Sequence, residues 1–420
     1  MKRTLVVIAT DYPYGFGEPF LEGELIAFSD YFSKICIVIP EHTSVDKSRK
    51  IFVLPSNAEL LFLDNKTTIA HKLFAVARIF TSRAIEHLRE IRKEYKLQLS
   101  LPVIKAFLAY EAKNFSFRNH LLRILKEKEI SLDELYFYTC WMTEYTFSIA
   151  HLKREYPSIK VFTRMHGWDV YFERHSPPYL PYRKFILQSI DMAATISDNG
   201  RKYILEKIKD VPPEKVKTFH LGAEKGLLKL KQFQGTLILL TLSFIRPVKR
   251  MELIIDAIGK IDDVELVWHH VGGGEDDYAE SIKSLAKEKL LQKRNVKFFF
   301  HGTFEKDKLY EFLSDTDIDL VVNTSVSEGL PVSIMEAMAH SIPAIAPKVG
   351  GIPEIVEHGV NGFLMSPGAG GNELVSFILE FHKMNLETKN RFRKNAYNTW
   401  NTQFNMRKNH QRFAEAVIKL

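Results

Sequence analysis

The chain has 420 residues, of which 45% are apolar and 26% are charged, and this composition predicts folded domains and argues against disorder. Its net charge is +7, and its two cysteines, Cys36 and Cys140, lie in separate apolar runs. This excludes a disulfide framework and a zinc site built on cysteines, and it favours buried thiols in a reducing compartment.

The first fifteen residues predict a β-strand. Two basic residues precede a short apolar run that ends at Asp11, which is too short for a signal peptide. No run in the sequence has the roughly 18 apolar residues of a membrane span. We therefore expect a cytoplasmic protein.

Short apolar runs alternate with longer amphipathic segments in the first half of the chain. The runs expected to form strands are 5–10, 34–40, 135–140, 160–165 and 192–197. Strands that alternate with helices are typical of a parallel sheet that is covered on both faces.

Residues 66–128 are basic, with 14 Lys or Arg against 5 Asp or Glu. Apolar residues recur there at helical spacing, and most of the basic ones point elsewhere around the same helix. The apolar set is Ile69, Leu73, Val76, Phe80, Ala84, Leu88 and Ile91, and the basic set is Lys72, Arg78, Arg83, Arg89 and Arg92. A helix packed on its own domain fits this pattern, and contact with an anionic membrane, at the inner face, is a secondary hypothesis. No nucleic-acid-binding module accompanies the charge, so we expect no nucleic-acid partner.

The same alternation begins again after residue 230. Strands are expected at 236–243, 264–273, 296–302, 319–325 and 343–348, and helices close the chain from Asn395. The Lys- and Gly-rich segment 223–235 is interpreted as a linker.

The prediction is therefore an α/β protein with two Rossmann-like, doubly wound parallel-sheet domains that face each other across a cleft. The first domain is 1–228, with a closing helix at about 400–420 that packs back on it, and the second is 229–399. In such sheets ligands bind beyond the carboxyl ends of the strands, so residues just after strands are the candidates for function.

Lys249 and Arg250 follow one of these strands and precede a helix whose apolar residues Met251, Ile254, Ile255 and Ile258 should face inward. Cations at the start of a helix oppose its dipole unless an anion binds there. A bound phosphate would reverse the sign of this interaction. The alternative is a solvated pair of cations, and the position after a strand favours the phosphate.

Residues 327–351 read SEGLPVSIMEAMAHSIPAIAPKVGG and place two carboxylates eight residues apart. Glu328 precedes a Gly-Leu-Pro turn, and Glu336 lies inside the helix that follows. The backbone N–H groups from Gly329 through Leu330 to Val332 should cradle a phosphate, with Pro331 as the first helical residue. The carboxylates suit hydroxyl groups of a sugar and a ribose.

Two further candidates lie in the first half. His166 follows a buried strand and precedes Gly167 and Asp169, which places an imidazole at the edge of the sheet, although a structural histidine is an equal alternative. Gly15 and Gly17 follow the first strand and suit backbone approach to an acceptor or a phosphate. They lack the full dinucleotide fingerprint, so NAD is not favoured.

Together these motifs resemble a retaining glycosyltransferase of family 4 with the GT-B fold. The similarity rests on Glu328 and Glu336, on SFIRPVKR (243–250), on HGWD (166–169) and on GGIPEIVEHGVNGFLMSP (350–367). It extends over nearly the whole chain. The segments FGEPFLEGEL and YTCWMTE resemble the branch that builds bacterial exopolysaccharide or lipopolysaccharide.

The resemblance implies that the protein transfers a sugar, with retention, from a nucleotide diphosphate sugar to a saccharide or lipid-linked acceptor. It implies that Lys249 contacts the donor diphosphate, that Glu336 binds the ribose, and that Glu328 holds sugar hydroxyls beside the backbone of Gly329 and Leu330. His166 would lie near the reacting sugar. One departure is Phe244, which stands where many members carry an arginine, so that Arg246 or Arg250 would have to supply the second cation.

No metal or other cofactor is expected, because Lys249 and the helix start can stabilise the leaving diphosphate and the run DTDID (315–319) should lead into a strand. Two alternatives stay open. One is a nucleotide-sugar epimerase or hydrolase on the same fold, and the other is a non-catalytic scaffold.

Overall fold

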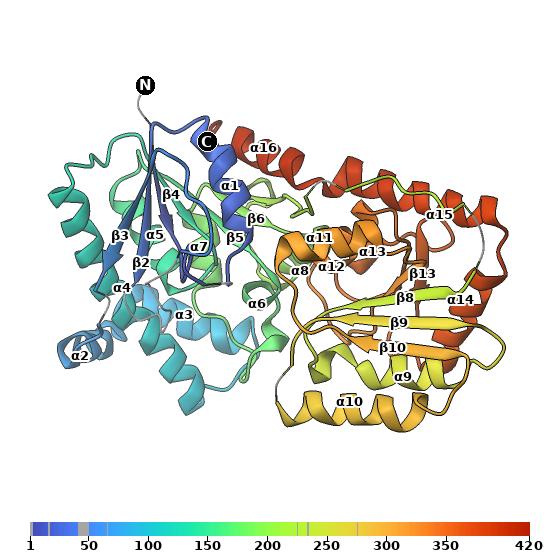
Figure 1. The fold of residues 1–420 in the computed structure, drawn as a ribbon. Coiled ribbons are helices and arrows are strands. Elements are labelled where there is room, and N and C mark those ends of the chain that lie inside the picture. The colour runs from blue at the N-terminus through green and yellow to red at the C-terminus, as the bar shows by residue number, and fades with distance from the viewer. Residues whose placement is uncertain are drawn as a thin grey trace. The chain divides into compact units, whose positions relative to one another are not determined.

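A computed structural model describes residues 3–15, 17–40, 50–64, 66–224, 226–232, 235–274 and 276–420. The chain divides into two compact units, of which the first is Met1–Phe219 with His410–Leu420 and the second is His220–Asn409. Each unit is built on one parallel sheet with helices on its faces (Figure 1).

The sheet of the first unit has seven parallel strands in the order β3-β2-β1-β4-β5-β6-β7. They are β1 (Thr4–Ile8), β2 (Lys34–Pro40), β3 (Ala58–Leu63), β4 (Leu135–Thr139), β5 (Lys160–Met165), β6 (Met192–Thr195) and β7 (Val216–Thr218). The strand order reverses between β1 and β4, and a doubly wound sheet binds its ligands at such a point.

Both faces of this sheet are buried. Along β1, Val6 and Ile8 enter one core while Leu5 and Val7 enter the other. Successive side chains of a strand point to opposite faces of the sheet. Because helices cover both faces, every side chain of such a strand is buried, and its sequence is a continuous apolar run. The helices are α1 (Phe20–Ser29), α2 (Ile69–Arg78), α3 (Ser82–Lys93), α4 (Leu101–Glu127), α5 (Glu144–Glu155), α6 (Gly167–Val170), α7 (Arg183–Ser189), α8 (Asp198–Lys207) and, at the end of the chain, α16 (Met406–Val417).

The second unit has six parallel strands in the order β10-β9-β8-β11-β12-β13. They are β8 (Leu237–Leu242), β9 (Leu266–Val271), β10 (Val296–Phe300), β11 (Leu320–Val322), β12 (Ala344–Pro347) and β13 (Gly362–Met365). Its helices are α9 (Met251–Gly259), α10 (Asp277–Leu290), α11 (Lys306–Asp315), α12 (Val332–Ala339), α13 (Ile352–Ile355), α14 (Gly371–Lys383), α15 (Leu386–Thr399) and the π-helical turn Trp400–Phe404. The order reverses between β8 and β11.

Every strand expected from the sequence is present, with ends that differ by a few residues. Three strands were missed: β3, β7 and β13. β7 has only three residues, and in β3 (AELLFL) the apolar run is only four residues long and two-thirds of the strand's residues are not buried. The pairing of these segments with a neighbouring strand, which the sequence does not show, makes them strands.

The boundary between the units falls at 219/220, whereas the sequence placed it at 228/229. Of the expected linker 223–235, residues 223–224, 226–232 and 235 are described, and they are fixed to the second unit. Lys229 donates its N–H to the Ser341 hydroxyl at 3.0 Å, and the Lys231 ammonium lies 2.5 Å from Asp319. Residues 400–409 also belong to the second unit, and the chain enters the first unit again at His410.

The end of the chain completes the core of the first unit. Phe413 of α16 is fully buried and packs at 5.5 Å from Phe28 and 5.8 Å from Phe162, measured between ring centroids. The sheet of this unit is therefore covered on one face by a helix from its own beginning and a helix from the end of the chain.

The helical pattern over 69–91 is broken in two. Thr81 has an extended backbone and its hydroxyl accepts the N–H of Ala84, so it ends the run after α2 and caps α3. Ala84 and Ile91 are buried, as an amphipathic helix requires, but the apolar residues of α2 are mostly exposed. None of the helices in the described ranges combines the length and the apolar character needed to cross a membrane.

Candidate active site

The strongest candidate site lies at the carboxyl ends of β8 and β11, where the strand order of the second unit reverses. Lys249 follows β8, and its ammonium lies 2.6 Å from Oε1 of Glu328, which follows β11. Both side chains are largely buried, with 25% and 11% of their surface exposed. The sheet topology thus joins two residues that the sequence predicted separately.

The same carboxylate oxygen accepts two more hydrogen bonds. Ser325 donates its hydroxyl at 2.6 Å and Asn323 donates its amide at 3.2 Å. For Oε2 of Glu328, the described residues supply no hydrogen-bond donor. Three donors thus fix one oxygen of the carboxylate and leave the other for a ligand.

The turn that carries Glu328 is held from below by two glycines. Gly350 has a φ of +54°, and a Cβ at this position would lie 1.9 Å from the Glu328 carbonyl oxygen. Gly351 donates its N–H to the Gly329 carbonyl at 2.7 Å. Only glycine permits the backbone at position 350 to lie this close to the Glu328 carbonyl. Gly350 and Gly351 therefore hold the turn that carries Glu328 in place.

The start of α12 presents backbone donors beside this carboxylate. Across the described ranges, the N–H groups of Gly329, Leu330, Val332 and Ser333 have no acceptor. The helix begins at Val332, one residue later than expected, so Pro331 is its N-cap and not its first helical residue. Unpaired N–H groups at a helix start form the kind of cradle that binds phosphate.

Glu336 lies in the second turn of α12, half-buried. Burial raises the pKa of this carboxyl to about 7, and the nearby Lys306 ammonium only partly opposes that effect. Its side chain accepts no hydrogen bond from the described part of the chain. A carboxylate with a raised pKa and no partner is poised to accept hydroxyl hydrogens from a ligand.

The arginines of this loop are already engaged. Arg250 donates Nε to the Thr324 carbonyl at 2.7 Å and Nη1 to the Ala369 carbonyl at 3.4 Å. Its backbone is left-handed, with a φ of 49°, and it caps α9. Arg250 therefore supports the loop that carries Asn323 and Ser325, while its Nη2 is buried without a hydrogen-bond partner among the described residues, and its contact with the donor stays a prediction.

Arg246 is the other cation that the sequence offered. Its side chain is 63% exposed and pairs with Asp276 at 3.1 Å. Phe244, in place of the family arginine, is 59% exposed. A small cavity lies among Lys249, Asn323 and Ser333 at the ends of β8 and β11, and no arginine lines it.

The run DTDID leads into β11, as expected, and its carboxylates have structural partners. Asp319 accepts the N–H of Ile238 at 2.9 Å and pairs with Lys231. Arg393 of α15 lies 3.5 Å from Asp317. These acids are at the amino end of the strand, so the carboxylate site at Glu328 is at its other end.

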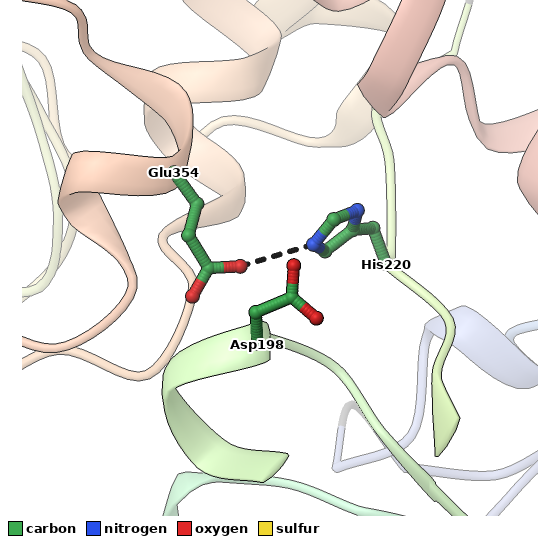
Figure 2. A group of neighbouring side chains, drawn as sticks. All are labelled: Asp198, His220 and Glu354. Atoms are coloured by element: carbon green, nitrogen blue, oxygen red, sulfur yellow. Dashed lines mark hydrogen bonds and ion pairs between the residues drawn. The ribbon is translucent and has the colours of Figure 1, made fainter. Parts of the chain in front are cut away.

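A further ion pair anchors the segment that follows the glycine pair. Glu354 of α13 accepts a hydrogen bond from Nε2 of His220 at 3.0 Å (Figure 2). His220 in turn packs on the Phe404 ring, with centroids 5.1 Å apart. Asp198, also drawn there, belongs to the first unit, where it accepts the Thr218 hydroxyl at 2.5 Å.

In the first unit, His166 follows β5, the strand that pairs with β4. Its ring is buried between Phe20 and Trp141, with centroids 4.5 and 4.4 Å away. Burial and then the charge of Arg164 lower the pKa of His166 to about 3, and a hydrogen bond to the Cys140 backbone opposes this.

This leaves a neutral imidazole. Nε2 is buried and lacks any hydrogen-bond partner among the described atoms. In the tautomer protonated at Nδ1, Nε2 keeps a lone pair that can accept a hydrogen bond from a ligand hydroxyl. Asp169 fixes the backbone at this position, since its Oδ1 accepts the backbone N–H of His166 at 2.5 Å.

The loop after β1 does not offer the expected glycine N–H groups. Gly15 donates to the Asp11 carbonyl at 3.0 Å, and Gly17 donates to the Asp11 carboxylate at 3.3 Å. The nearby cradle formed by the N–H groups of residues 10–12 is filled by Glu18, which is fully buried. The glycine N–H groups and those of residues 10–12 are thus engaged within the loop, and the role of Gly15 and Gly17 toward an acceptor or a phosphate stays a prediction.

Comparison with known proteins identifies this architecture. Residues 228–399 match the family model described as glycosyl transferases group 1. The structure of Anabaena Alr3699/HepE in complex with UDP superposes with a TM-score of 0.67 at 17% identity and covers 100% of both chains. Residues 228–399 thus match a glycosyltransferase domain, and the two units together have the GT-B fold.

Two curated relatives each match about half of this chain. N-acetyl-alpha-D-glucosaminyl L-malate synthase of Bacillus anthracis is 28% identical over 221 residues, which cover 50% of this chain and 55% of the relative. The putative colanic acid biosynthesis glycosyltransferase WcaL of Salmonella typhimurium is 23% identical over 236 residues, covering 54% and 57%. The match thus spans a little over half the length of each relative.

Some contacts were not foreseen from the sequence. In the second unit, Asn323 and Ser325 donate hydrogen bonds to Glu328. In the first unit, the Glu18 carboxylate accepts the indole N–H of Trp141 at 3.0 Å. The segments that contain Glu18 and Trp141 carried the resemblance. Their contact is between residues 123 positions apart, which no local pattern indicates.

Proposed function

We propose that the protein transfers a sugar from a nucleotide diphosphate sugar to a saccharide or lipid-linked acceptor, with retention, in the synthesis of a cell-surface polysaccharide. The observation that supports it most is the Lys249–Glu328 pair beside the unpaired N–H groups of α12. One end of this arrangement suits a diphosphate and the other suits sugar hydroxyls.

The diphosphate is proposed to lie at the start of α12. As the glycosidic bond breaks, negative charge develops on the leaving diphosphate. The Lys249 ammonium and the N–H groups of Gly329 and Leu330 stabilise that charge in place, without reorganising. Lys249 can do this while it stays bound to Glu328, because an ammonium has three hydrogens to donate.

The two carboxylates address the two ends of the donor. Oε2 of Glu328 accepts hydroxyl hydrogens of the transferred sugar, and Glu336 accepts those of the ribose. Glu328 is held by three donors at its other oxygen, which suits a group that positions the sugar. We assign it no nucleophilic role.

His166 is proposed to accept a hydrogen bond from a hydroxyl of the reacting sugar. With a pKa of about 3 it stays neutral, so it is a weak base and serves to position the substrate. One relative is named as an L-malate synthase and another for colanic acid biosynthesis, so the acceptor is proposed only as a class. A lipid-linked acceptor would place the basic region 66–128 at an anionic membrane on its inner, cytoplasmic side.

A thermal-shift screen against UDP-, GDP-, dTDP- and ADP-sugars tests the donor site, since a ligand at 100 times its Kd stabilises by about 2.7 kcal/mol. UDP is the first choice, because it is the nucleotide in the HepE complex. A shift with one nucleotide class supports the proposal. Consumption of the sugar donor without any acceptor would favour an epimerase or hydrolase, and no shift with any nucleotide would favour a scaffold.

A further inference from the structure

Helix α2 carries a stripe of exposed apolar side chains. Ile69, Leu73, Val76 and Phe80 are 77%, 66%, 47% and 82% exposed. Ile69, Leu73 and Val76 recur at intervals of four and three residues, which places them on one face of α2, and Phe80 lies in the turn just after the helix end at Arg78. A contiguous apolar face left in water is costly unless it is covered.

The packing of α2 fixes this face outward. On the other side of the helix, Ala75 is buried and Phe74 stacks on Phe115 of α4 at 4.2 Å. Arg78 lies 3.2 Å from the buried carboxylate of Glu111. Because α2 is attached through these residues, rotating the stripe inward would break an ion pair and an aromatic contact.

The positive charge of the protein is concentrated around this stripe. Residues 66–128 hold 14 of the 58 Lys or Arg but only 5 of the 51 Asp or Glu, so the remainder of the chain is close to neutral. Lys66 precedes the stripe and Lys72 lies within it, and both are exposed. An apolar stripe with cations beside it has the composition of a helix that lies in a membrane interface.

An unusual pair of arginines follows the stripe. Arg83, three residues after Phe80, and Arg154 of α5 both lie 4.5 Å from the centroid of Phe185. Neither forms an ion pair with any carboxylate of the described residues. Two guanidinium groups on one ring repel each other, and the nearby Glu111 carboxylate, which pairs with Arg78, only partly offsets this for Arg83.

His151 adds a donor to the same cluster. It is buried, and burial and then the charge of Arg83 lower its pKa to about 2, so the ring is neutral. Both ring nitrogens face Nη1 of Arg83, at 2.9 and 3.0 Å. A neutral imidazole keeps one N–H, and a guanidinium has no lone pair to accept it. The cluster therefore has more donors than acceptors, and an anion would balance it.

We propose that α2 and the start of α3 form a docking surface for an anionic lipid bilayer. The side chains of Ile69, Leu73, Val76 and Phe80 enter the boundary between headgroups and acyl chains, and Lys72, Arg83 and Arg154 bind lipid phosphates. This surface deepens the membrane contact of the proposed function, and it suits an acceptor held in the membrane.

A bilayer fits this surface better than a second copy of the chain. Two copies joined through the stripe would bring two basic regions together, and like charges oppose that association. Anionic headgroups supply the opposite charge, and acyl chains supply the apolar cover, at the same interface.

Flotation of the full-length protein with phosphatidylcholine vesicles, with and without phosphatidylglycerol, tests the proposal. We expect binding only to the anionic vesicles. Leu73→Glu should weaken it at least about tenfold, because it removes an inserted group and adds a repelled charge. The double substitution Lys72→Gln with Arg154→Gln should also weaken vesicle binding by about tenfold or more, because each cation near an anionic membrane contributes roughly fivefold to the affinity.

Matched controls come from the second unit. Leu291 is 67% exposed among lysines, so Leu291→Glu repeats the chemistry of Leu73→Glu elsewhere, and Arg391→Gln with Lys394→Gln repeats the charge change. Both controls should float like the wild type. Since the substituted residues are exposed, circular dichroism melts of all variants should agree.

Several outcomes would overturn the proposal. They are absence of binding to anionic vesicles, equal loss in the controls, or a stable dimer in light scattering that Leu73→Glu dissolves, which would assign the stripe to a second copy. Vesicle binding needs no sugar transfer. A nucleotide thermal shift in a protein that does not float would therefore reject the docking surface and leave the proposed function intact.

Discussion

The ammonium of Lys249 lies 2.6 Å from Oε1 of Glu328, although 79 residues separate them in the chain. The two residues follow neighbouring strands, β8 and β11, at the carboxyl edge of the sheet. This pair joins a cation suited to a diphosphate with a carboxylate suited to a sugar. Its geometry exists before any ligand binds, so the site is preorganised.

Replacing Lys249 with alanine should weaken nucleotide-sugar binding by about 1–3 kcal/mol, as the loss of a charge-assisted hydrogen bond does. Glu336→Ala should cost a similar amount. Isothermal titration with the donor found in the thermal-shift screen measures both. Lys260→Ala, which removes an exposed lysine bonded to Asn372, is the control and should bind as the wild type does. Unchanged affinity in both variants would remove the assignment of this site.

The ionisation of Glu336 should make donor binding depend on pH. Its folded pKa is about 7, so the carboxylate that accepts ribose hydroxyls is populated above that pH. Donor affinity should therefore rise between about pH 6 and pH 8 in the wild type. In Glu336→Gln it should be weaker and flat over that range. A wild-type profile that is equally flat would contradict the role of Glu336.

The same group should affect stability in the opposite direction. Burial raises the pKa of Glu336 from its ordinary value of 4.5, so between about pH 4.5 and pH 7 the folded protein holds a proton that the unfolded chain has released. The free energy of unfolding must therefore fall as the pH rises through this window. Glu336→Gln should gain thermal stability relative to the wild type at pH 8 and not at pH 4. Melting temperatures at these two values decide the point.

Gly350→Ala should disturb donor binding from a distance. Its φ of +54° disfavours alanine, and the new Cβ would lie 1.9 Å from the Glu328 carbonyl oxygen, so the turn must move. We expect about tenfold or greater loss of donor affinity. Gly359→Ala is a matched control, because its φ is +76° with nothing within 4 Å of a Cβ. It should cost only about 1 kcal/mol of stability and leave affinity unchanged.

The buried pair Arg164 and Glu24 should be essential to the first unit. Both are fully buried, 2.6 Å apart, and Tyr138 donates its hydroxyl to Glu24 at 2.5 Å. Arg164→Met alone should destabilise this unit by about 3–5 kcal/mol, because it leaves a buried carboxylate without its cation. Arg164→Met with Glu24→Leu should recover most of that loss. Urea unfolding followed by near-ultraviolet circular dichroism compares the variants, and additive losses would contradict the pairing.

His166→Ala should lower the rate of transfer by about 100-fold, the usual cost of one hydrogen bond made near the transition state. Donor affinity should fall by much less than the rate, because the diphosphate and ribose contacts proposed above come from the second unit and His166 adds one hydrogen bond to the sugar. The transfer rate with saturating donor measures the first effect, and titration measures the second. Loss of donor affinity instead would assign His166 to donor binding.

The sequence by itself determined the architecture and the chemistry of the donor site. Apolar runs such as 34–40 and 343–348 must be strands buried on both faces, since only a covered parallel sheet leaves them no polar side. The spacing of Glu328, the Gly-Leu-Pro turn and Glu336 is local, so a turn and a helix start follow from it directly. These features need only neighbouring residues to form.

The tertiary structure alone decided which groups are available. Whether Arg250 is free or bound to the carbonyls of Thr324 and Ala369, and whether an N–H cradle is open or filled by Glu18, depends on contacts between residues far apart in sequence. The exposure of Leu73 and Phe80 is of the same kind, because an amphipathic pattern shows that a helix has an apolar face but not what covers it. Local spacing fixes the type of a group, and only long-range packing fixes its partners.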